Sequence, residues 1–274
     1  MNSLMLNMDG VQIPQLGFGV WQVPDDEAEQ AVQTAFQAGY RHVDTAQAYG
    51  NEAGVGRAVR DSGVPRRKLF ITTKLWNADH DQAERAFEGS LSRLGLDYVD
   101  LYLIHWPVPE QDKYVEAWRA LERIYRDGRA KAIGVSNFTV QHLTRLLDET
   151  DIAPSLNQIE LHPYFQQRQL RDFHEANGIL TEAWSPLGQG RELLDDPALA
   201  VLAGKHGKTP AQIVLRWHVQ LGHVAIPKSV TPSRIKENVQ VFDFTLDVED
   251  MAAIGAMNRR LRIGPDPDTF NFLG

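Results

Sequence analysis

The chain is organised around the sequence Arg41-His42-Val43-Asp44-Thr45-Ala46-Gln47-Ala48-Tyr49. Its first half is typical of a short buried strand, and the glycine that follows Tyr49 indicates a loop. The strand carries the carboxylate of Asp44 to its far end, and the loop carries the phenol of Tyr49. Two later apolar segments end in the same way, one near Lys74 and the other at His105. Four ionisable groups at the ends of three strands indicate one shared site.

Apolar segments and helical segments alternate along the rest of the chain. The apolar segments are nearly continuous, as expected for strands that helices cover, and glycine or proline marks many of the boundaries. The expected strands are residues 16–21, 41–44, 69–75, 99–106, 130–136, 155–161, 179–185 and 224–228. The expected helices are residues 25–38, 51–60, 79–94, 113–126, 140–149, 168–177, a longer helical region that ends at Leu221, and 231–241, with a further short helix after Asp247. Thr209-Pro210-Ala211-Gln212 has the spacing of a capping box inside the longer region.

The alternation predicts a particular α/β architecture. Strands that alternate with helices pair in parallel, and eight such units in 274 residues match a (β/α)8 barrel, or TIM barrel. A short β-hairpin over residues 4–13, with its turn at Asp9-Gly10, precedes the barrel. Residues 263–274 are expected to form a C-terminal loop. We expect residues 1–274 to be one domain.

An open doubly wound sheet is the alternative architecture. Such sheets often bind dinucleotides through a Gly-x-Gly-x-x-Gly loop that follows a strand. Gly17-Phe18-Gly19 and Gly188-Gln189-Gly190 each lack the third glycine, and no phosphate loop that ends in Gly-Lys-Ser/Thr is present. The sequence therefore favours the barrel.

The composition excludes several classes of function. The formal net charge of −8 argues against a non-specific nucleic-acid surface. The absence of cysteine excludes disulfides and thiolate zinc sites, and it fits a reducing compartment such as the cytoplasm. No apolar run approaches the ~18 residues that a membrane span needs, and Met1–Met5 has no charged start of a signal peptide.

The four strand-end groups suit the protonation of a carbonyl oxygen. Asp44 can neutralise a buried Lys74, and the lysine cation is expected to lower the pKa of Tyr49. A phenol of lowered pKa is a better proton donor near neutral pH, and His105 can share the negative charge that develops on the oxygen. Each of these residues alone is more often structural than catalytic. Since no protein nucleophile is evident, the attacking group is expected to be a hydride from a cofactor.

A second set of residues indicates a phosphate site near the last strand. Lys228, Ser229 and Arg234 flank the start of the helix at Thr231-Pro232, and barrels often hold phosphate near their seventh and eighth strands. A solvated basic turn is the alternative interpretation. Polar and aromatic groups at three other strand ends suit a flat ring with a carboxamide, namely Ser136, Asn137, Gln158 and Trp184.

A metal site is a further hypothesis. His42 and Asp44 alternate on one strand, so they share a face and could bind a metal with His105 and His162. Metal-dependent hydrolases on this fold use a His-x-His pair, but here the second position is an aspartate. We expect no catalytic metal.

Motifs in the same order along the chain resemble those of the aldo-keto reductases. They are residues 39–46 with 49–52, Thr72–Trp76, Asp100–Pro107, Ile133–Phe138, Asn157–Glu160 and Ile226–Ser229 with Arg234, Glu237 and Asn238. The resemblance covers residues 5 to about 245. Short loops, and Trp184 where many relatives carry tyrosine, look most like the bacterial 2,5-diketo-D-gluconate reductase branch.

This resemblance implies an NADPH-dependent carbonyl reductase that acts on aldehydes or ketones, with 2,5-diketo-D-gluconate and 2-dicarbonyl compounds among the expected substrates. It implies a catalytic tetrad of Asp44, Tyr49, Lys74 and His105, with Tyr49 as the acid. The implied cofactor residues are Ser136, Asn137 and Gln158 at the carboxamide, Trp184 on the nicotinamide, Ser185, Leu187, Gly188 and Gln189 at the pyrophosphate, Lys228, Ser229 and Arg234 at the 2′-phosphate, and Glu237 and Asn238 at the adenine.

The substrate is expected to lie among Trp21, Trp76, His105, Trp106 and the C-terminal tail, where the match to the family is poorest. A monomer is expected. A cofactor-binding sensor on a reductase-like barrel remains an alternative from a different class. An intact acid–base set argues against a sensor, because a pure binding protein has no use for it.

Overall fold

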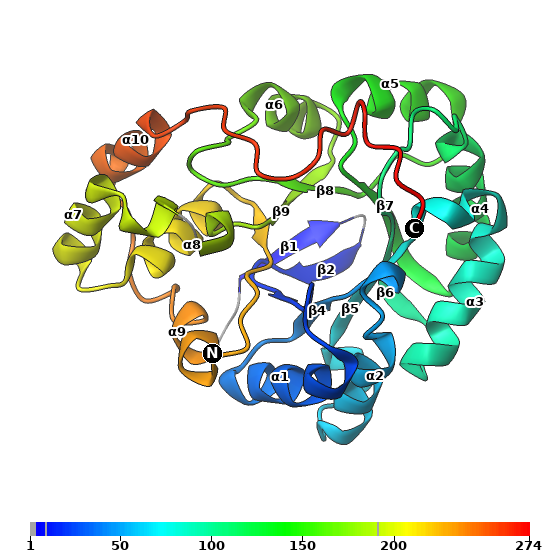
Figure 1. Ribbon diagram of the computed structural model, residues 1–274, viewed down its shortest axis with the longest axis horizontal. Coiled ribbons are helices and arrows are strands. Elements are labelled where there is room, and N and C mark those ends of the chain that lie inside the picture. Colours follow the sequence, from blue (N-terminus) through cyan, green and yellow to red (C-terminus); the bar gives the residue numbers. More distant parts are fainter. Residues whose placement is uncertain (1–3, 9, 191) are drawn as a thin grey trace.

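The strands form one parallel sheet that closes on itself (Figure 1). The computed structural model describes residues 4–8, 10–190 and 192–274. The strands follow chain order around the sheet as β3 Phe18–Gly19, β4 His42–Asp44, β5 Phe70–Leu75, β6 Val99–Ile104, β7 Ala130–Ser136, β8 Leu156–Glu160, β9 Leu180–Trp184 and β10 Val224–Ala225. A parallel bridge between Leu16 and Ala225 joins the two ends. The predicted (β/α)8 barrel is confirmed.

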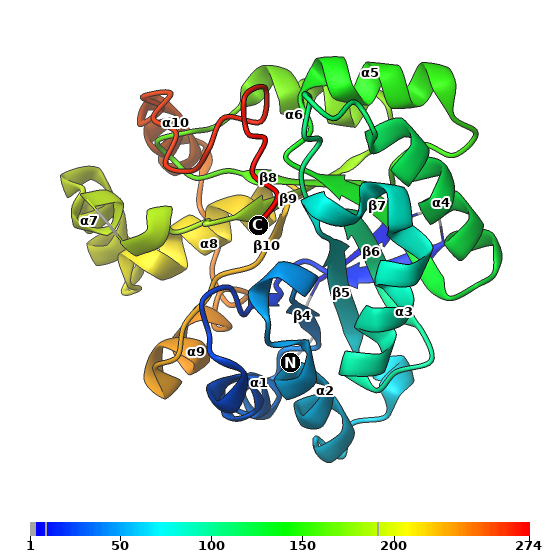
Figure 2. The ribbon, with the colours of Figure 1, turned by 45° about the vertical axis from the view of Figure 1, so that its right-hand side comes forward.

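Helices cover the outside of the barrel (Figures 1 and 2). Those that follow the strands are α1 Asp25–Ala38, α2 Glu52–Asp61, α3 Ala83–Leu94, α4 Tyr114–Arg126, α5 Val140–Glu149, α6 Arg168–Ala176, α8 Pro210–Gln220 and α9 Pro232–Asn238. Helix α1 buries an apolar stripe at helical spacing, made up of Ala28, Ala31, Val32, Ala35 and Phe36. No helix in the described part of the chain is long and apolar enough to cross a membrane.

An antiparallel hairpin closes the floor of the barrel. Strands β1 Met5–Met8 and β2 Val11–Pro14 pair in register. The side chains of Met8 and Ile13 pack with Phe70 and Leu156, the first residues of β5 and β8. The predicted hairpin is confirmed, although Asp9 of its turn lies outside the described residues, as do residues 1–3. The hairpin blocks the N-terminal end and leaves the opposite end open.

The first and last strands are shorter than predicted. Pro227 has no N–H group, so it cannot donate a hydrogen bond to the neighbouring strand. The two ends of the sheet are instead joined by hydrogen bonds from Gly17 N to Ala225 O, at 2.9 Å, and from Gly19 N to Pro227 O, at 3.1 Å. The seam is also tight. A Cβ at Gly17 would lie 2.5 Å from Nδ1 of His42, so only glycine fits there.

The region predicted as a longer helical stretch consists of four pieces. They are two 3-10 turns, η4 Gly188–Gly190 and η5 Glu192–Asp195, followed by α7 Pro197–His206 and α8. Gly207, with φ of 61°, ends α7 in the left-handed conformation. The predicted capping box is confirmed, because the side chain of Thr209 accepts from Gln212 N and the Gln212 side chain accepts from Thr209 N.

The C-terminal tail is an ordered strap rather than a helix or strand. After α10 Val248–Ala256 it crosses the open end of the barrel, in red in Figure 1. The buried carboxylate of Glu160 accepts from Ile263 N and Gly264 N, at 2.6 and 2.8 Å. At the far end, Trp76 Nε1 donates to the carbonyl of Leu273 at 2.7 Å.

Candidate active site

Three neighbouring strands bring the predicted tetrad together. Asp44 is the last residue of β4, Lys74 is near the end of β5, and His105 directly follows β6. The Lys74 Nζ atom lies 2.6 Å from Asp44 Oδ1 and 3.4 Å from the Tyr49 hydroxyl. A third bond, of 2.9 Å, runs to the carbonyl of Thr45. The geometry that the sequence predicted at the strand ends is therefore present.

The ion pair at the centre is removed from water. The side chains of Lys74 and Asp44 are 0 % and 2 % exposed. Burial opposes the charge of Lys74, but Asp44 and Tyr49 outweigh it, so the net pKa of Lys74 is raised. Burial also raises the pKa of Asp44, against the opposing influence of Lys74. Each charge therefore depends on the other.

The environment of Tyr49 corrects one prediction. Burial raises the pKa of Tyr49, and the lowering by Lys74 only partly offsets it. The expectation of a net lowered pKa is therefore wrong for the protein alone. The sequence places the lysine beside the phenol, but it does not show how far the surrounding protein buries that phenol. Lys74 remains the group that favours a negative charge on the Tyr49 oxygen.

His105 is a neutral ring at the site. Burial, followed by the charge of Lys74, holds the pKa of His105 well below its usual value. Its ring lies edge-on to Tyr49 and Trp76, with centroids 5.7 and 5.2 Å apart. Asn137 Nδ2 donates to the backbone carbonyl of His105 at 3.0 Å and fixes the strand end. A neutral imidazole can donate one hydrogen bond to a carbonyl oxygen without giving up its proton.

A buried polar network continues below the tetrad, and the sequence analysis missed it. Gln158 Nε2 donates to Asp44 Oδ2 and to Glu182 Oε2, at 2.8 and 2.9 Å. His42 Nε2 lies 3.7 Å from Glu182 Oε1 and 3.2 Å from the hydroxyl of Thr72. The available signal was the position of Glu182 two residues before Trp184, which places both side chains on one face of a strand.

This network makes stability depend on pH. Burial and the nearby Asp44 raise the pKa of Glu182 to about 8, from 4.5 in an unfolded chain. Between these values the folded state holds a proton that the unfolded state releases, so stability falls as pH rises. We expect the melting temperature of Glu182→Gln minus that of wild type to be larger at pH 8 than at pH 5. An equal difference at both pH values would contradict this.

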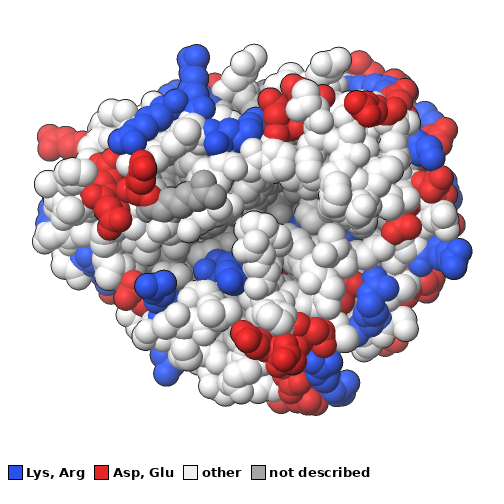
Figure 3. Space-filling view, viewed as in Figure 1, with Lys and Arg blue, Asp and Glu red and all other residues white. Residues whose placement is uncertain are grey.

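The tetrad opens into a long cleft of about 1270 Å³, which Figure 3 shows as a hollow in one face. Ser136, Asn137 and Trp184 line one wall of it. Asn137 already has partners, because its Nδ2 bonds Ser136 Oγ at 3.0 Å and its Oδ1 accepts from Trp184 Nε1 at 2.8 Å. Its φ of 63° is unusual for a residue with a side chain. Asn137 thus joins the Trp184 ring to the His105 strand.

The predicted phosphate residues lie farther along the same cleft. Lys228 and Arg234 are exposed on its wall, and neither has an ion-pair partner among the described residues. Ser229 Oγ accepts from Thr231 N at 3.1 Å, and Glu237 accepts from the Thr209 hydroxyl at 2.7 Å. The cleft lining also includes Ser185, Leu187, Gln189, Glu237 and Asn238.

Gly188 is the exception among the predicted cofactor residues. It is buried and does not line the cleft, although both of its neighbours do. Its φ is 61°, and a Cβ there would lie 3.0 Å from Leu193 Cδ2. Gly188 therefore shapes the loop whose neighbouring residues line the cleft, and its predicted contact with the cofactor stays a prediction.

Aromatic side chains surround the tetrad on the substrate side. Trp21, Trp76 and Trp106 line the cleft as predicted. The tail adds two rings that the sequence analysis did not single out: Phe270, whose centroid lies 4.4 Å from that of Trp106, and Phe272, at 6.3 Å from Trp76. A Phe-x-Phe pair in a loop was the available signal.

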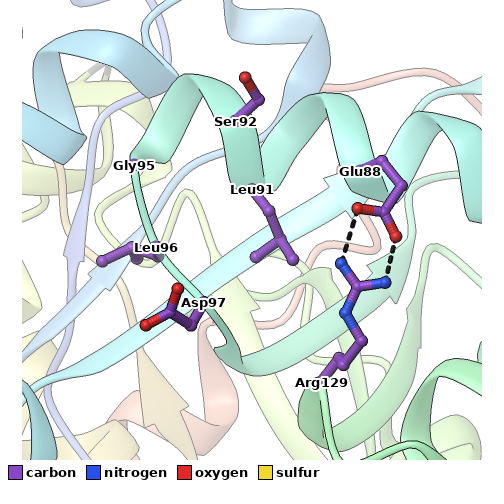
Figure 4. Close-up of a pocket in the computed structure, with 7 residues that line it drawn as sticks. All are labelled: Glu88, Leu91, Ser92, Gly95, Leu96, Asp97 and Arg129. Carbon is purple, nitrogen blue, oxygen red and sulfur yellow. Dashed lines mark hydrogen bonds and ion pairs between the residues drawn. The ribbon is translucent and has the colours of Figure 1, made fainter.

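The other candidate sites offer fewer groups that could take part in a reaction. Within the described residues, no group of three or more His, Asp or Glu side chains is arranged to hold a metal. His162 of the proposed metal set bonds Glu160 at 3.1 Å. A second hollow of about 530 Å³ lies between α3 and the start of β7, where Arg129 already pairs with Glu88 (Figure 4). Its lining includes the hydroxyl of Ser92 but no histidine or lysine that could act as a base beside it.

Comparison with known proteins agrees with this geometry. The profile described as "Aldo/keto reductase family" matches residues 15–259. The chain belongs to the aldo/keto reductase family. Its members are oxidoreductases that act on carbonyl groups, so the reductase resemblance in the sequence is confirmed.

Several relatives are similar over almost their whole length. An aldo-keto reductase of Mycolicibacterium smegmatis is 56% identical over 268 residues, which is 97% of each chain. Methylglyoxal reductase DkgA of Escherichia coli K12 is 54% identical over 263 residues, or 96% of each. A crystal structure of an aldo/keto reductase from Brucella melitensis is 54% identical, with TM-score 0.91, and covers 94% of this chain and 100% of its own. A mutant of Gox0644 solved in complex with NADPH is 49% identical, with TM-score 0.95 and coverage of 99% and 100%.

Proposed function

We propose that this protein is an NADPH-dependent carbonyl reductase in which Tyr49 donates the proton. The observation that carries the proposal is the 3.4 Å approach of Lys74 Nζ to the Tyr49 hydroxyl at the base of a long cleft. When bound, the reduced nicotinamide supplies the hydride. Tyr49 protonates the carbonyl oxygen, Lys74 stabilises the phenolate that remains, and neutral His105 donates a hydrogen bond that orients the oxygen.

The residues along the cleft fit this cofactor. Trp184 offers a flat ring, and the amide of Gln158 lines the cleft beside it. Lys228 and Arg234 are cations without ion-pair partners among the described residues, in a chain of net charge −8. Such cations suit the 2′-phosphate that distinguishes NADPH from NADH. The related Gox0644 mutant was solved with NADPH, which supports the same choice here.

Replacement of Arg234 by alanine tests the cofactor assignment. The KM for NADPH is expected to rise by about tenfold or more, whereas the KM for NADH should change little, because only NADPH carries the phosphate. Lys236→Ala, an exposed cation of the same helix that does not line the cleft, is the matched control. Equal losses for both cofactors in Arg234→Ala would remove the 2′-phosphate assignment.

The substrate class is a small carbonyl compound. Tryptophan and phenylalanine rings form the walls near Tyr49, and the related DkgA is named as a methylglyoxal reductase. We propose 2-dicarbonyl compounds and sugar-derived ketones, such as 2,5-diketo-D-gluconate, as candidates. Steady-state oxidation of NADPH and NADH with a panel of carbonyls tests this. A cofactor-binding sensor would bind NADPH without turnover, and a metal-dependent hydrolase would lose activity with a chelator.

We also propose that residues 1–274 act as one domain and as a monomer. The tetrad, the cofactor wall and the substrate wall all come from one chain and one barrel. The lack of cysteine supports a cytoplasmic location. Light scattering coupled to size exclusion, with and without NADPH, measures the oligomeric state.

A further inference from the structure

The proposed reaction makes no use of one buried acid, Glu182. It lies on β9 inside the barrel and is 0 % exposed. Its Oε2 accepts from Gln158 Nε2 at 2.9 Å, while its Oε1 has no hydrogen-bond partner among the described residues and faces His42 Nε2 at 3.7 Å. Burying a carboxyl group without a cation beside it costs folding free energy, so we expect Glu182 to have a function.

The hydrogen bonds of Gln158 suggest that role. An amide nitrogen has two protons, and here one goes to Asp44 Oδ2 and the other to Glu182 Oε2. The reverse amide orientation would set the carbonyl oxygen of Gln158 against the Asp44 carboxylate, which repels it. The amide is therefore fixed with both donors engaged. No hydrogen bond to its Oε1 is recorded among the described residues, and Gln158 lines the cleft beside Trp184.

We propose that Glu182 is a positioning residue: together with Asp44 it holds both amide protons of Gln158, so that Gln158 presents only an acceptor to the cofactor carboxamide. This inference rests on the proposed function, because it assumes that the nicotinamide lies on Trp184. Glu182 touches neither the cofactor nor the substrate. It acts through Gln158.

The charge state of Glu182 supports this arrangement. When two carboxyl groups accept from the same amide nitrogen, ionising both costs free energy because the two negative charges repel each other. Asp44 has the cation of Lys74 as its partner. Burial and Asp44 raise the pKa of Glu182 to about 8, so Glu182 is neutral at lower pH. The groups that face or influence it are His42 and Asp44 on β4, Thr72 and Lys74 on β5, Gln158 on β8, and Tyr49.

Two substitutions test the hydrogen-bond acceptor and the negative charge of Glu182 separately. Glu182→Leu removes one of the two acceptors, leaves the Gln158 amide held by Asp44 alone, and is expected to raise the Kd for NADPH about tenfold, with a smaller loss of kcat. Glu182→Gln imitates the neutral acid and keeps an acceptor, so it should restore most of that affinity. Glu122→Leu is the matched control: Glu122 is buried on α4, where it accepts from Asp151 N and Ile152 N away from the cleft.

The pH dependence gives a readout that a merely structural role would not change. Ionised Glu182 adds a negative charge near the ring site, which favours the cationic oxidised cofactor over the neutral reduced one. In wild type, the ratio of Kd for NADPH to Kd for NADP⁺ should therefore rise about fivefold as pH passes 8. In Glu182→Gln the ratio should stay flat, because the side chain cannot ionise.

Fluorescence titrations with NADPH and NADP⁺ between pH 6 and pH 9.5 test both expectations. Unchanged NADPH affinity in a folded Glu182→Leu would overturn the inference. If Glu182→Leu does not fold, Glu182→Gln decides: a ratio that still rises as in wild type would overturn it too. A wild-type protein that binds no NADPH would instead refute the proposed function, so the two failures are distinct.

Discussion

Tyr49→Phe is expected to lower kcat for carbonyl reduction about 10³-fold, within the range that general acids contribute. The Tyr49 hydroxyl lies beside the Lys74 cation, at 3.4 Å from its Nζ. Phenylalanine keeps the ring, including its edge-on packing against His105. The Kd for NADPH should therefore stay within about twofold of wild type.

The control for Tyr49→Phe is Tyr102→Phe on β6. Its hydroxyl is buried, has no hydrogen-bond partner in the part of the chain that the structure describes, and lies outside the cleft, with the ring packed on Phe87. Removal of that hydroxyl should leave kcat unchanged. Wild-type turnover in Tyr49→Phe would remove the assigned proton donor, whereas an equal loss in both variants would show that the effect is not specific.

Lys74→Met is expected to impair both stability and turnover. Asp44 would remain in the barrel without its cation, and breaking a buried pair in this way costs about 3–5 kcal/mol of unfolding free energy. Turnover should fall as in Tyr49→Phe or further, since Lys74 is the cation that bonds the Tyr49 hydroxyl and favours its anion. Urea unfolding and NADPH oxidation measure the two effects.

The matched control removes an exposed lysine. Lys113 pairs with Asp81 at 2.9 Å, but both side chains are at least 40 % exposed, so solvent replaces the lost partner. Lys113→Met should unfold at nearly the wild-type urea concentration. If Lys74→Met also keeps wild-type stability, the account of the buried pair is wrong.

The tetrad could be predicted because local signals fix where its strands end. Gly50 follows Tyr49, and Pro107 stops the strand that carries His105. In a parallel barrel these ends must meet at one rim. Asp44 and Lys74 therefore had to converge, whatever the details of the loops.

Other features depend on information that no local pattern contains. The net pKa of Tyr49 is set by burial, which the complete barrel creates. Glu182 resembles an ordinary polar residue in an apolar strand until Gln158 and Asp44 are placed beside it. The burial of Gly188 against Leu193 likewise depends on how the loop packs. Long-range packing decides each of these.

The most direct test of the central claim follows the hydride and the proton separately. NADPH that carries deuterium on its reactive C4 position is mixed with a carbonyl substrate in ordinary water, and the product alcohol is analysed by mass spectrometry and NMR. The alcohol should carry one deuterium on the former carbonyl carbon and a solvent-derived proton on the oxygen. An alcohol without deuterium on that carbon, formed while NADPH is consumed, would contradict direct hydride transfer at this site.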